Sequence, residues 1–555
     1  MRANDGTRTA AEVLIDQLVI HGVRQMFCVP GESYIAVLDA LRDTPIRLVV
    51  ARHEAGAANM AEAYGKLTGR PGICLVTRAP GATHAATGVF AAYQDSTPMV
   101  LLVGQVPRRQ RGREAFQELD YARMFGEIAK WVVELDDVCR LPEAIARAFH
   151  VASSGRAGPV VIAMPEDVLA YEADVDDATP FTAAQAAPSR TELADVRRLV
   201  AAAERPLVVV GGGGWTAAAA DDLRSFVESC ELPVATSFRR QDYVDNASPS
   251  YAGVLTIGQD PALAKRVEAA DVLLVVGSRL GEIATRGYTT VEVPRPRQTL
   301  IHVHADPDEL GRVYDADLGI VSGSPQFLAA VRALEPLETT RWEAWTRSAR
   351  ADYLANLRHE PHGSDVDLGN VMAHLRERLD DDAILTNGAG NYTVWAHRFY
   401  EFHRYRTQLA PCSGAMGYGI PAAIAAKIVH PDRDVVCLSG DGDFLMSGHE
   451  LAAARQEQTA IVVLVVNNGM YGTIRMHQER QFPKRVIGTA LVNPSFVDLG
   501  RAYGAHAELV EQDEDFPDAL DRALQAGRPA LLELRVDPEA ITPRATISAI
   551  RAGAG

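Results

Sequence analysis

The chain has 555 residues, of which 47% are hydrophobic and 23% are charged, a globular composition that excludes a disordered or fibrous protein. This length predicts about three domains, because it exceeds what one hydrophobic core supports. The formal net charge of −17 disfavours nucleic acid as a partner, since a phosphate-binding surface needs clustered Lys and Arg.

The sequence also predicts a protein that neither spans a membrane nor carries a signal peptide. No apolar run approaches the ~20 residues that cross a bilayer, and the stretch Met1–Thr9 is polar. The cysteines lie apart from one another, without the spacing of a metal site. This pattern predicts reduced, buried thiols and a cytoplasmic location. The six residues are Cys28, Cys74, Cys139, Cys230, Cys412 and Cys437.

Short runs rich in Val, Ile and Leu alternate with Ala-rich segments of helix length along nearly the whole chain. This alternation predicts the α/β class, with parallel sheets covered by helices on both faces. The first group of predicted strands comprises Gln25–Val29, Arg47–Val50, Gly72–Val76, Met99–Val103 and Val160–Ala163. The second comprises Pro206–Val210, Val234–Thr236, Val272–Val276, Leu300–His304 and Leu318–Val321. The third comprises Ala383–Thr386, Val435–Leu438, Ile461–Val466 and Ala530–Arg535.

Two polar stretches interrupt this alternation, Tyr171–Arg190 and Leu337–Asp367. Their composition predicts linkers or an interdomain helix rather than sheet. The chain is therefore predicted to form three doubly wound parallel-sheet domains, at residues 1–175, 190–337 and 366–555.

The first group carries a charged motif at the end of a predicted strand. Arg52-His53-Glu54 follows the second strand of that group and precedes a small-residue helix over Ala55–Leu67. A carboxylate at this place can cap the helix. In a dry site it can instead act as a fixed acid–base group.

The second group has two glycine-containing turns after predicted strands, Gly211–Gly214 and Gly277–Arg279. Such turns are typical of nucleotide-binding domains, but a glycine run alone does not establish a nucleotide site. The sequence therefore predicts a fold of the nucleotide-binding type for the middle of the chain, but it does not predict a ligand.

The third group contains Gly440-Asp441-Gly442 after one predicted strand, and Asn468 after the next strand, 27 residues beyond Asp441. Parallel strands bring both motifs to the carboxyl edge of one sheet, where α/β proteins bind ligands. A carboxylate, an amide oxygen and the Met470 carbonyl form an oxygen set suited to Mg²⁺ bound to phosphate. The alternative is a pair of tight turns, which are common in α/β loops.

Taken together, these motifs resemble the thiamine diphosphate-dependent enzyme superfamily, whose fingerprint is Gly-Asp-Gly, a gap of this length, and Asn-Asn. The segments His53–Tyr64, Pro80–Thr83 and Asp95–Pro98 look like the pyrimidine-binding domain of acetolactate synthase and benzoylformate decarboxylase relatives. The resemblance extends from about Thr9 to about Asp537. It implies a pyrimidine-binding domain, a middle domain of nucleotide-binding fold and a diphosphate-binding domain.

The resemblance implies thiamine diphosphate and Mg²⁺ as cofactors. Glu54 stands where the family places the glutamate that hydrogen-bonds the aminopyrimidine ring and so activates the cofactor. Met416 stands where a bulky apolar residue wedges between the two cofactor rings, and the alternative is a core methionine. Gly390 replaces a bulkier polar residue, which leaves only backbone contacts from its loop. The implied cofactor-binding residues are Glu54, Pro30, Thr77, Gly81, Gly388, Ala389, Gly414, Met416, Gly440, Asp441, Gly442, Asp443, Asn468, Met470, Tyr471, Gly472 and Thr473, with Asp441, Asn468 and Met470 as metal ligands.

The implied reaction is that of the acetolactate synthases, which decarboxylate a 2-keto acid such as pyruvate and ligate the remaining fragment to a second carbonyl. Phe116, Gln117 and Lys130 match the segment that these enzymes place over the substrate. Glu32 matches the position of an acid that relays protons in pyruvate decarboxylases. Ile474 stands where those enzymes carry a second acid, so the sequence favours carboligation over aldehyde release.

Several departures from the family pattern leave alternatives open. Thr473 and His477 replace the residues that shape the acceptor pocket of acetolactate synthases, so the acceptor is not predicted, and His84 replaces a usual Asn. A non-oxidative 2-keto acid decarboxylase is the alternative enzyme. A cofactor-binding scaffold without activity is the alternative outside catalysis.

The resemblance also bears on flavin and on assembly. The segment Arg279–Ile283 differs from the Arg-Phe-Asp-Asp-Arg type with which acetolactate synthases bind a structural flavin, which disfavours FAD. An oxidase of the pyruvate oxidase type is an alternative only if FAD binds. Because the family completes each site from two subunits, the resemblance implies a homodimer or homotetramer with its sites at the subunit interface.

Overall fold

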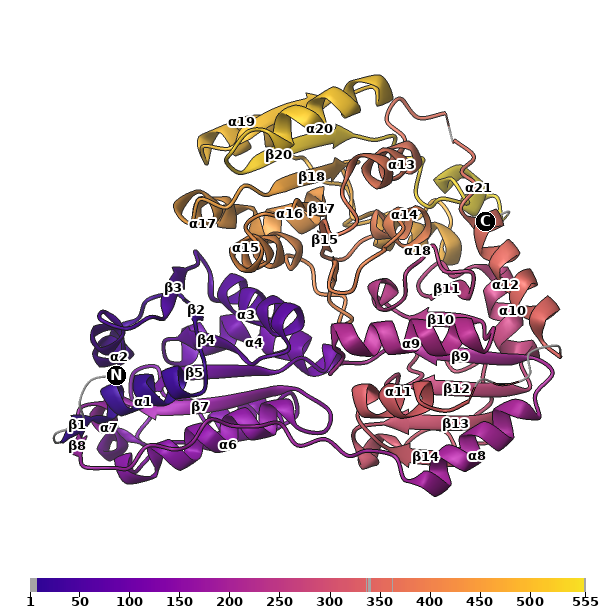
Figure 1. Ribbon diagram of the computed structural model, residues 1–555. Coiled ribbons are helices and arrows are strands. Elements are labelled where there is room, and N and C mark those ends of the chain that lie inside the picture. The colour runs from indigo at the N-terminus through magenta and orange to yellow at the C-terminus, as the bar shows by residue number, and fades with distance from the viewer. Residues whose placement is uncertain (1–6, 336, 338–340, 362, 554–555) are drawn as a thin grey trace. The chain divides into compact units, whose positions relative to one another are not determined.

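The computed structural model describes residues 7–335, 337, 341–361 and 363–553. It contains three six-stranded sheets in which every strand pairing is parallel, and a short antiparallel pair of strands (Figure 1). The predicted α/β class with three parallel-sheet domains is confirmed. The first sheet lies in one compact unit of the chain, and the second and third sheets lie in another.

The first sheet has the strand order β3-β2-β4-β5-β7-β6. Its strands are β2 (Gln25–Cys28), β3 (Arg47–Val50), β4 (Gly72–Val76), β5 (Met99–Gln105), β6 (Trp131–Glu134) and β7 (Pro159–Pro165). Its helices are α1 (Ala10–Ile20), α2 (Ile35–Leu41), α3 (Glu54–Thr68), α4 (Ala79–Asp95), α5 (Tyr121–Phe125), α6 (Leu141–Ser153) and α7 (Glu166–Leu169). The antiparallel pair joins β1 (Arg8–Thr9) to β8 (Glu172–Ala173).

Helices cover both faces of the first sheet, which explains why its strands read as continuous apolar runs. Val100 and Leu102 of β5 pack in one apolar cluster with α1, α2 and α6. Helices α3 and α4 pack closely against each other. A side-chain carbon at Gly88 of α4 would lie only 2.5 Å from the Ala58 Cβ of α3, so this approach requires glycine. This packing fixes the beginnings of α3 and α4, which carry the predicted pyrimidine-binding residues.

The second sheet has the strand order β11-β10-β9-β12-β13-β14. Its strands are β9 (Pro206–Val210), β10 (Val234–Ser237), β11 (Tyr251–Leu255), β12 (Val272–Val276), β13 (Thr299–His304) and β14 (Leu318–Val321). Its helices are α8 (Arg190–Ala201), α9 (Ala217–Ser229), α10 (Pro261–Ala269), α11 (Ser324–Arg332) and α12 (Glu343–Asn356). Side chains of β12 alternate between two apolar layers, since Leu274 packs with α8, α9 and α11 while Leu273 packs with α10.

The third sheet has the strand order β16-β15-β17-β18-β20-β19. Its strands are β15 (Ile384–Asn387), β16 (Gln408–Leu409), β17 (Val435–Gly440), β18 (Val462–Asn467), β19 (His506–Val510) and β20 (Ala530–Arg535). Its helices are α13 (Leu368–Arg378), α14 (Thr393–Phe399), α15 (Gly419–Val429), α16 (Asp441–Ser447), α17 (Leu451–Gln456), α18 (Gly472–Gln481), α19 (Phe496–Ala502), α20 (Phe516–Leu524) and α21 (Ile547–Arg551). The neighbouring strands β15, β17 and β18 deliver the loops with Gly388, Asp441 and Asn468 to one edge of the sheet.

Buried charged side chains join the second and third sheets. The Arg239 guanidinium donates hydrogen bonds to the carbonyl oxygens of Gly388, at 2.9 Å, and Pro411. The buried Asp242 carboxylate accepts hydrogen bonds from the backbone N–H groups of Arg406 and Thr407, at 2.9 and 3.1 Å. These contacts hold the predicted aminopyrimidine loop against the second sheet.

The stretch Leu337–Asp367, predicted as a linker or an interdomain helix, contains helix α12 (Glu343–Asn356). Helix α12 packs on the second sheet through Ala349 and Tyr353, and Trp342 just before it is fully buried. The helical layer of the second sheet therefore extends beyond residue 337, and residues 338–340 and 362 of the stretch lie outside the described residues. The domain boundaries 1–175, 190–337 and 366–555 stay predictions.

The cysteine prediction is confirmed in part. All six thiols are free, and four of them are buried, but Cys412 is half-buried and Cys139 is exposed. Residues 1–6 of the polar N-terminal stretch lie outside the described residues. Within the described part of the chain, no helix combines the length and apolarity needed to cross a bilayer.

Candidate functional site

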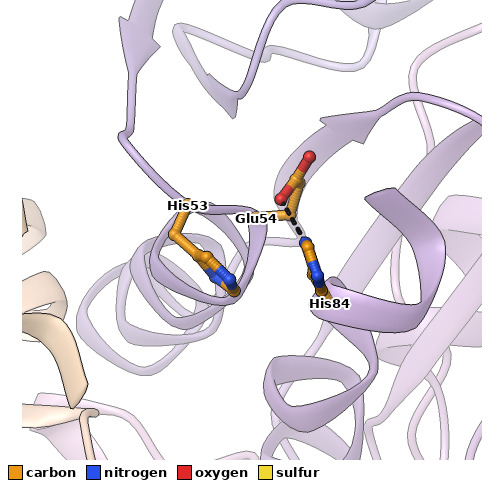
Figure 2. A group of neighbouring side chains, drawn as sticks. All are labelled: His53, Glu54 and His84. Atoms are coloured by element: carbon orange, nitrogen blue, oxygen red, sulfur yellow. Dashed lines mark hydrogen bonds and ion pairs between the residues drawn. The ribbon is translucent and has the colours of Figure 1, made fainter. Parts of the chain in front are cut away.

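Glu54 begins helix α3 at the carboxyl end of strand β3. His53 caps this helix, because its Nδ1 accepts a hydrogen bond of 3.1 Å from the Ala55 N–H. The cap therefore comes from the histidine, and the Glu54 carboxylate is available for another task. One of its oxygens, Oε2, lies 2.9 Å from Nδ1 of His84 on helix α4 (Figure 2).

The other Glu54 oxygen lies beside the first turn of α4. A side-chain carbon at Gly81 would lie 3.4 Å from Glu54 Oε1 and 3.0 Å from the Thr77 methyl group. A carbon at Gly31, next to the exposed Pro30, would overlap the Thr77 side chain at 2.5 Å. The structure thus brings the predicted residues Glu54, Thr77 and Gly81 together, with Pro30 following the neighbouring strand β2.

Gln117 lies at the same edge of the first sheet. Its backbone carbonyl accepts a hydrogen bond of 3.3 Å from the Ala79 N–H at the start of α4. The Glu118 carboxylate accepts hydrogen bonds from the backbone N–H groups of Gly112 and Ala115, which lower the pKa of Glu118 and fold the loop around it. Phe116 in this loop has 74% of its surface exposed, so its ring is available to cover a ligand.

Lys130 differs from the expectation that it lies over the substrate. It precedes strand β6, so it lies at the amino edge of the first sheet, whereas Glu54 follows the carboxyl end of β3. Its ammonium group donates hydrogen bonds to the carbonyl oxygens of Val151 and Ser154 at the end of α6, at 2.5 and 2.8 Å. This arrangement suits stabilisation of a helix C-terminus, and we omit Lys130 from the proposed mechanism.

Glu32 is exposed in the short turn after strand β2. Because β2 lies between β3 and β4, its carboxyl end is next to those that precede Glu54 and Thr77. The predicted proton-relay position therefore lies at the carboxyl edge of the first sheet, on the same side as Glu54.

The second group of site residues surrounds Asp441, the first residue of α16. Its carboxylate accepts three hydrogen bonds of 2.8 Å, from the backbone N–H groups of Gly442 and Gly469 and from the side-chain amide of Asn493. Burial raises the pKa of Asp441, and these hydrogen bonds oppose that shift. The carboxylate therefore joins the loops after β17 and β18.

The segment after β18 presents the other predicted metal ligands. Asn468 Oδ1 accepts a hydrogen bond of 3.1 Å from the Met470 N–H, and Met470 forms an isolated β-bridge with Ala490. Gly442 must lack a side chain, because a carbon there would lie 2.5 Å from the Tyr471 ring. The carboxylate, amide and carbonyl oxygens of Asp441, Asn468 and Met470 form a set that fits Mg²⁺ shared with phosphate.

Asp443 connects three loops of the third sheet. Its buried carboxylate accepts hydrogen bonds from the Tyr392 hydroxyl at 2.6 Å, the Gly417 N–H at 2.5 Å and the Ser439 hydroxyl at 3.0 Å. Burial raises the pKa of Asp443. The geometry gives Asp443, which was predicted as a cofactor contact, a positioning role among these segments.

Asp443 also borders the predicted aminopyrimidine loop. A side-chain carbon at Gly388 would lie only 2.3 Å from the Asp443 carboxylate, so that position requires glycine. The same carboxylate fixes Gly417, the residue after Met416, whose side chain is half-buried. The Asp443 carboxylate therefore contacts the loops that contain Ala389, Gly414 and Met416 as well as the end of β17 near Gly440.

Thr473 links the segment with the predicted metal ligands to the same loop. Its hydroxyl donates a hydrogen bond of 2.6 Å to Asn391 Oδ1, and Asn391 donates one of 2.9 Å to the Ile541 carbonyl. Gly472 precedes Thr473 at the start of α18, and a carbon at Gly472 would lie 3.3 Å from the Asn468 amide nitrogen. The predicted residues of the third sheet thus form one connected group.

Asn493 is a site residue that sequence reasoning missed. Its amide donates hydrogen bonds to Asp441 Oδ2 at 2.8 Å and to Asn467 Oδ1 at 3.0 Å. It lies 25 residues beyond Asn468 in an irregular segment, and only the folded chain brings it to Asp441. An Asn-Pro-Ser sequence carries no local signal of such a role.

Replacing Asn493 with alanine is expected to weaken Mg²⁺-dependent binding of thiamine diphosphate by about 10–100-fold, the usual effect of losing a partner that orients a metal ligand. The measurement is a cofactor titration followed by protein fluorescence at several Mg²⁺ concentrations. Asn370→Ala, which removes an exposed asparagine bonded to Asp513, is the matched control. Equal affinities in the two variants would contradict a role for Asn493 in orienting Asp441.

Comparison with known families gives three matches that together cover most of the chain. Residues 8–124 match the thiamine pyrophosphate enzyme N-terminal TPP binding domain. Residues 193–331 match the central domain of these enzymes, and residues 388–534 match their C-terminal TPP binding domain. Each match contains one of the three parallel sheets or most of it.

Similar proteins include the acetolactate synthase isozyme 2 large subunit of Escherichia coli, 30% identical over 95% of each chain. The acetolactate synthase large subunit of Corynebacterium glutamicum is 32% identical over 96% of this chain and 87% of its own. A probable acetolactate synthase large subunit of Methanocaldococcus jannaschii is 30% identical over 96% of this chain and 93% of its own. With these relatives and the three domain matches, the chain belongs to the thiamine pyrophosphate enzyme family and is acetolactate synthase-like along nearly its whole length.

Proposed function

We propose that the protein is a thiamine diphosphate- and Mg²⁺-dependent carboligase of the acetolactate synthase type. It decarboxylates a 2-keto acid such as pyruvate and joins the remaining fragment to a second carbonyl compound. The observation that carries this proposal is the connected group around Asp441, in which an oxygen donor set and glycine turns lie at one edge of the third sheet. Full-length similarity to acetolactate synthase large subunits supports the choice of reaction.

Bound thiamine diphosphate supplies a carbon nucleophile and accepts the electron pair released when CO₂ leaves. The residues of this chain bind and orient it. Asp441, Asn468 and the Met470 carbonyl would hold Mg²⁺ and, through it, the diphosphate. Backbone N–H groups at the start of α16 favour the negative phosphate oxygens.

The Glu54 carboxylate would hydrogen-bond the aminopyrimidine ring and stabilise the protonated form of that ring. Its side chain is only 13% exposed, so a charge–dipole contact there is weakly screened by water. We assign substrate contacts to Gln117 as a hydrogen-bond donor and Phe116 as an apolar cover, and a proton-relay role to Glu32.

The test is to incubate the protein with thiamine diphosphate, Mg²⁺ and a panel of 2-keto acids, and to identify the products by mass. The expected product contains the carbon atoms of two substrates less one CO₂. Release of free aldehyde alone would replace this proposal with a non-oxidative decarboxylase. A cofactor-binding scaffold would be indicated if no acid in the panel were consumed.

We propose that the site is complete only in a homodimer or homotetramer, because the chain carries one copy of each group of residues, with Glu54 in the first sheet's unit and Asp441 in the other. Mixing Glu54→Gln and Asp441→Ala homodimers is then expected to restore activity after subunit exchange. A mixed dimer has one site with both substitutions and one with neither, so random exchange should recover about a quarter of the wild-type rate. No recovery in a mixture that mass measurement shows to contain mixed dimers would contradict this assembly.

We further propose a cytoplasmic enzyme without flavin. The free thiols support a reducing compartment. The segment Arg279–Ile283, which differs from the flavin-binding segment of acetolactate synthases, supports the absence of flavin. A flavin absorption band in the purified protein would contradict the proposal and open the oxidase alternative.

A further inference from the structure

Three metal-binding side chains meet where helices α3 and α4 begin. They are His53, Glu54 and His84, and one ligand atom from each lies within 4.8 Å of the others. Figure 2 shows the carboxylate of Glu54 directed toward the His84 ring, and the His53 ring at the start of α3, the helix of Glu54. The two imidazole rings stack with their centroids 4.5 Å apart.

The two histidines offer donors that differ from those of the predicted Mg²⁺ site. Two imidazoles with one carboxylate are a common ligand set for Zn²⁺, which leaves a fourth position for water. Mg²⁺ prefers oxygen ligands, whereas imidazole favours Zn²⁺, Co²⁺ and similar ions. The cluster and the Asp441 group would therefore bind different metals.

Binding an ion requires the stacked His53 and His84 rings to turn toward it, but one pair of donor atoms is already close together. Nδ1 of His84 and Oε2 of Glu54 are 2.9 Å apart, close to the ~3.3 Å that separates two ligands of tetrahedral Zn²⁺. The ion would take the place of the proton between these atoms, and neutral His84 would carry its proton on Nε2. Since the His84 side chain is 52% exposed, that nitrogen can face water and the ring can turn toward the ion.

His53 can join without losing its structural role. Its Nδ1 accepts the capping hydrogen bond from Ala55, and Nε2 is the nitrogen that an ion would take. Two of the donors come from adjacent residues of one helix start and the third from the helix packed against it, so the fold holds all three in place.

We propose that His53, Glu54 and His84 form a binding site for a divalent transition-metal ion such as Zn²⁺ in the cofactor-free protein, and that the bound ion inhibits the enzyme by occupying the Glu54 carboxylate. The inhibitory part rests on the proposed function, in which thiamine diphosphate needs that carboxylate. The ion and the cofactor then compete for one side chain.

The experiment titrates Zn²⁺ into cofactor-free protein by calorimetry and records the visible spectrum of bound Co²⁺. His84→Asn, Glu54→Gln and His53→Asn remove one donor each, and asparagine at position 53 keeps the helix capped. Circular dichroism checks that each variant folds. The matched control is His506→Asn, because His506 also contacts a carboxylate, that of Glu508 at 2.7 Å, and no third donor is grouped with this pair among the described residues.

We expect one Zn²⁺ site per chain whose affinity falls by about 100-fold in each of the three variants and stays unchanged in the control. Tetrahedral Co²⁺ bands should disappear in the same three variants. Wild-type affinity in all three would overturn the site. Saturation with thiamine diphosphate and Mg²⁺ should weaken Zn²⁺ binding, and an unchanged affinity would overturn the inhibitory part. Zn²⁺ binding is measured without cofactor or turnover. The Zn²⁺ titration can therefore be interpreted even if the proposed reaction is not observed.

Discussion

Replacing Glu54 with glutamine is expected to lower turnover by about 10²–10⁴-fold while thiamine diphosphate still binds. The amide keeps the size of the side chain and a hydrogen-bonding oxygen, but it cannot stabilise the protonated form of the aminopyrimidine ring as a carboxylate does. Because His53 provides the cap of α3, the substitution should leave the helix intact. Steady-state kinetics and a cofactor titration measure the two quantities separately.

The matched control for this experiment is Glu143→Gln. Glu143 is an exposed glutamate in the first turn of α6, paired with Arg140 on the surface. It should keep wild-type turnover. Turnover of the Glu54 variant equal to that of the control would remove Glu54 from the mechanism.

Replacing Asp441 with alanine is expected to abolish most of the Mg²⁺-dependent affinity for thiamine diphosphate. Loss of a residue that orients a metal ligand costs about 10–100-fold, and loss of the ligand itself is expected to cost at least as much. The substitution also removes the acceptor of the Gly442 N–H and one of the two acceptors of the Gly469 N–H. Asn468→Ala removes a second proposed ligand and should act in the same direction.

Titrations at several Mg²⁺ concentrations separate a lost metal site from a general loss of binding. The control is Asp518→Ala, which removes an exposed carboxylate from the first turn of α20. Thermal unfolding of the Asp441 variant shows whether the two loops still pack. Unchanged titration curves for both Asp441→Ala and Asn468→Ala would mean that the metal ligands lie elsewhere.

The strands that the sequence predicted lie mostly inside the sheets, where both faces are covered and the residues are apolar throughout. Six strands were missed. Four of them are edge strands of the six-stranded sheets, β6, β11, β16 and β19, and the other two, β1 and β8, form the short antiparallel pair. Strand β16 has only two residues, β19 alternates His506 and Glu508 with apolar residues, and Gly253 interrupts β11. Edge strands have weaker patterns because one side of the strand lacks a partner.

A missed strand also explains why the sequence did not show the place of Lys130 in the sheet. Without β6 in the prediction, nothing in the sequence showed that Lys130 comes before a strand rather than after one, and so at the opposite edge from Glu54. Glu54, Thr77 and Asp441 could be placed because each directly follows a recognisable apolar run. Asn493 and the Asp443 network depend on contacts between segments distant in sequence, which no local pattern reports.

The contact between Gly388 and Asp443 constrains how relatives of this chain can vary. The carboxylate that would meet a side chain at position 388 is held by three hydrogen bonds and cannot move aside cheaply. A relative with a larger residue at position 388 should therefore carry a smaller residue at position 443. The two positions are expected to covary, and a double substitution should be tolerated where Gly388→Ala alone is not.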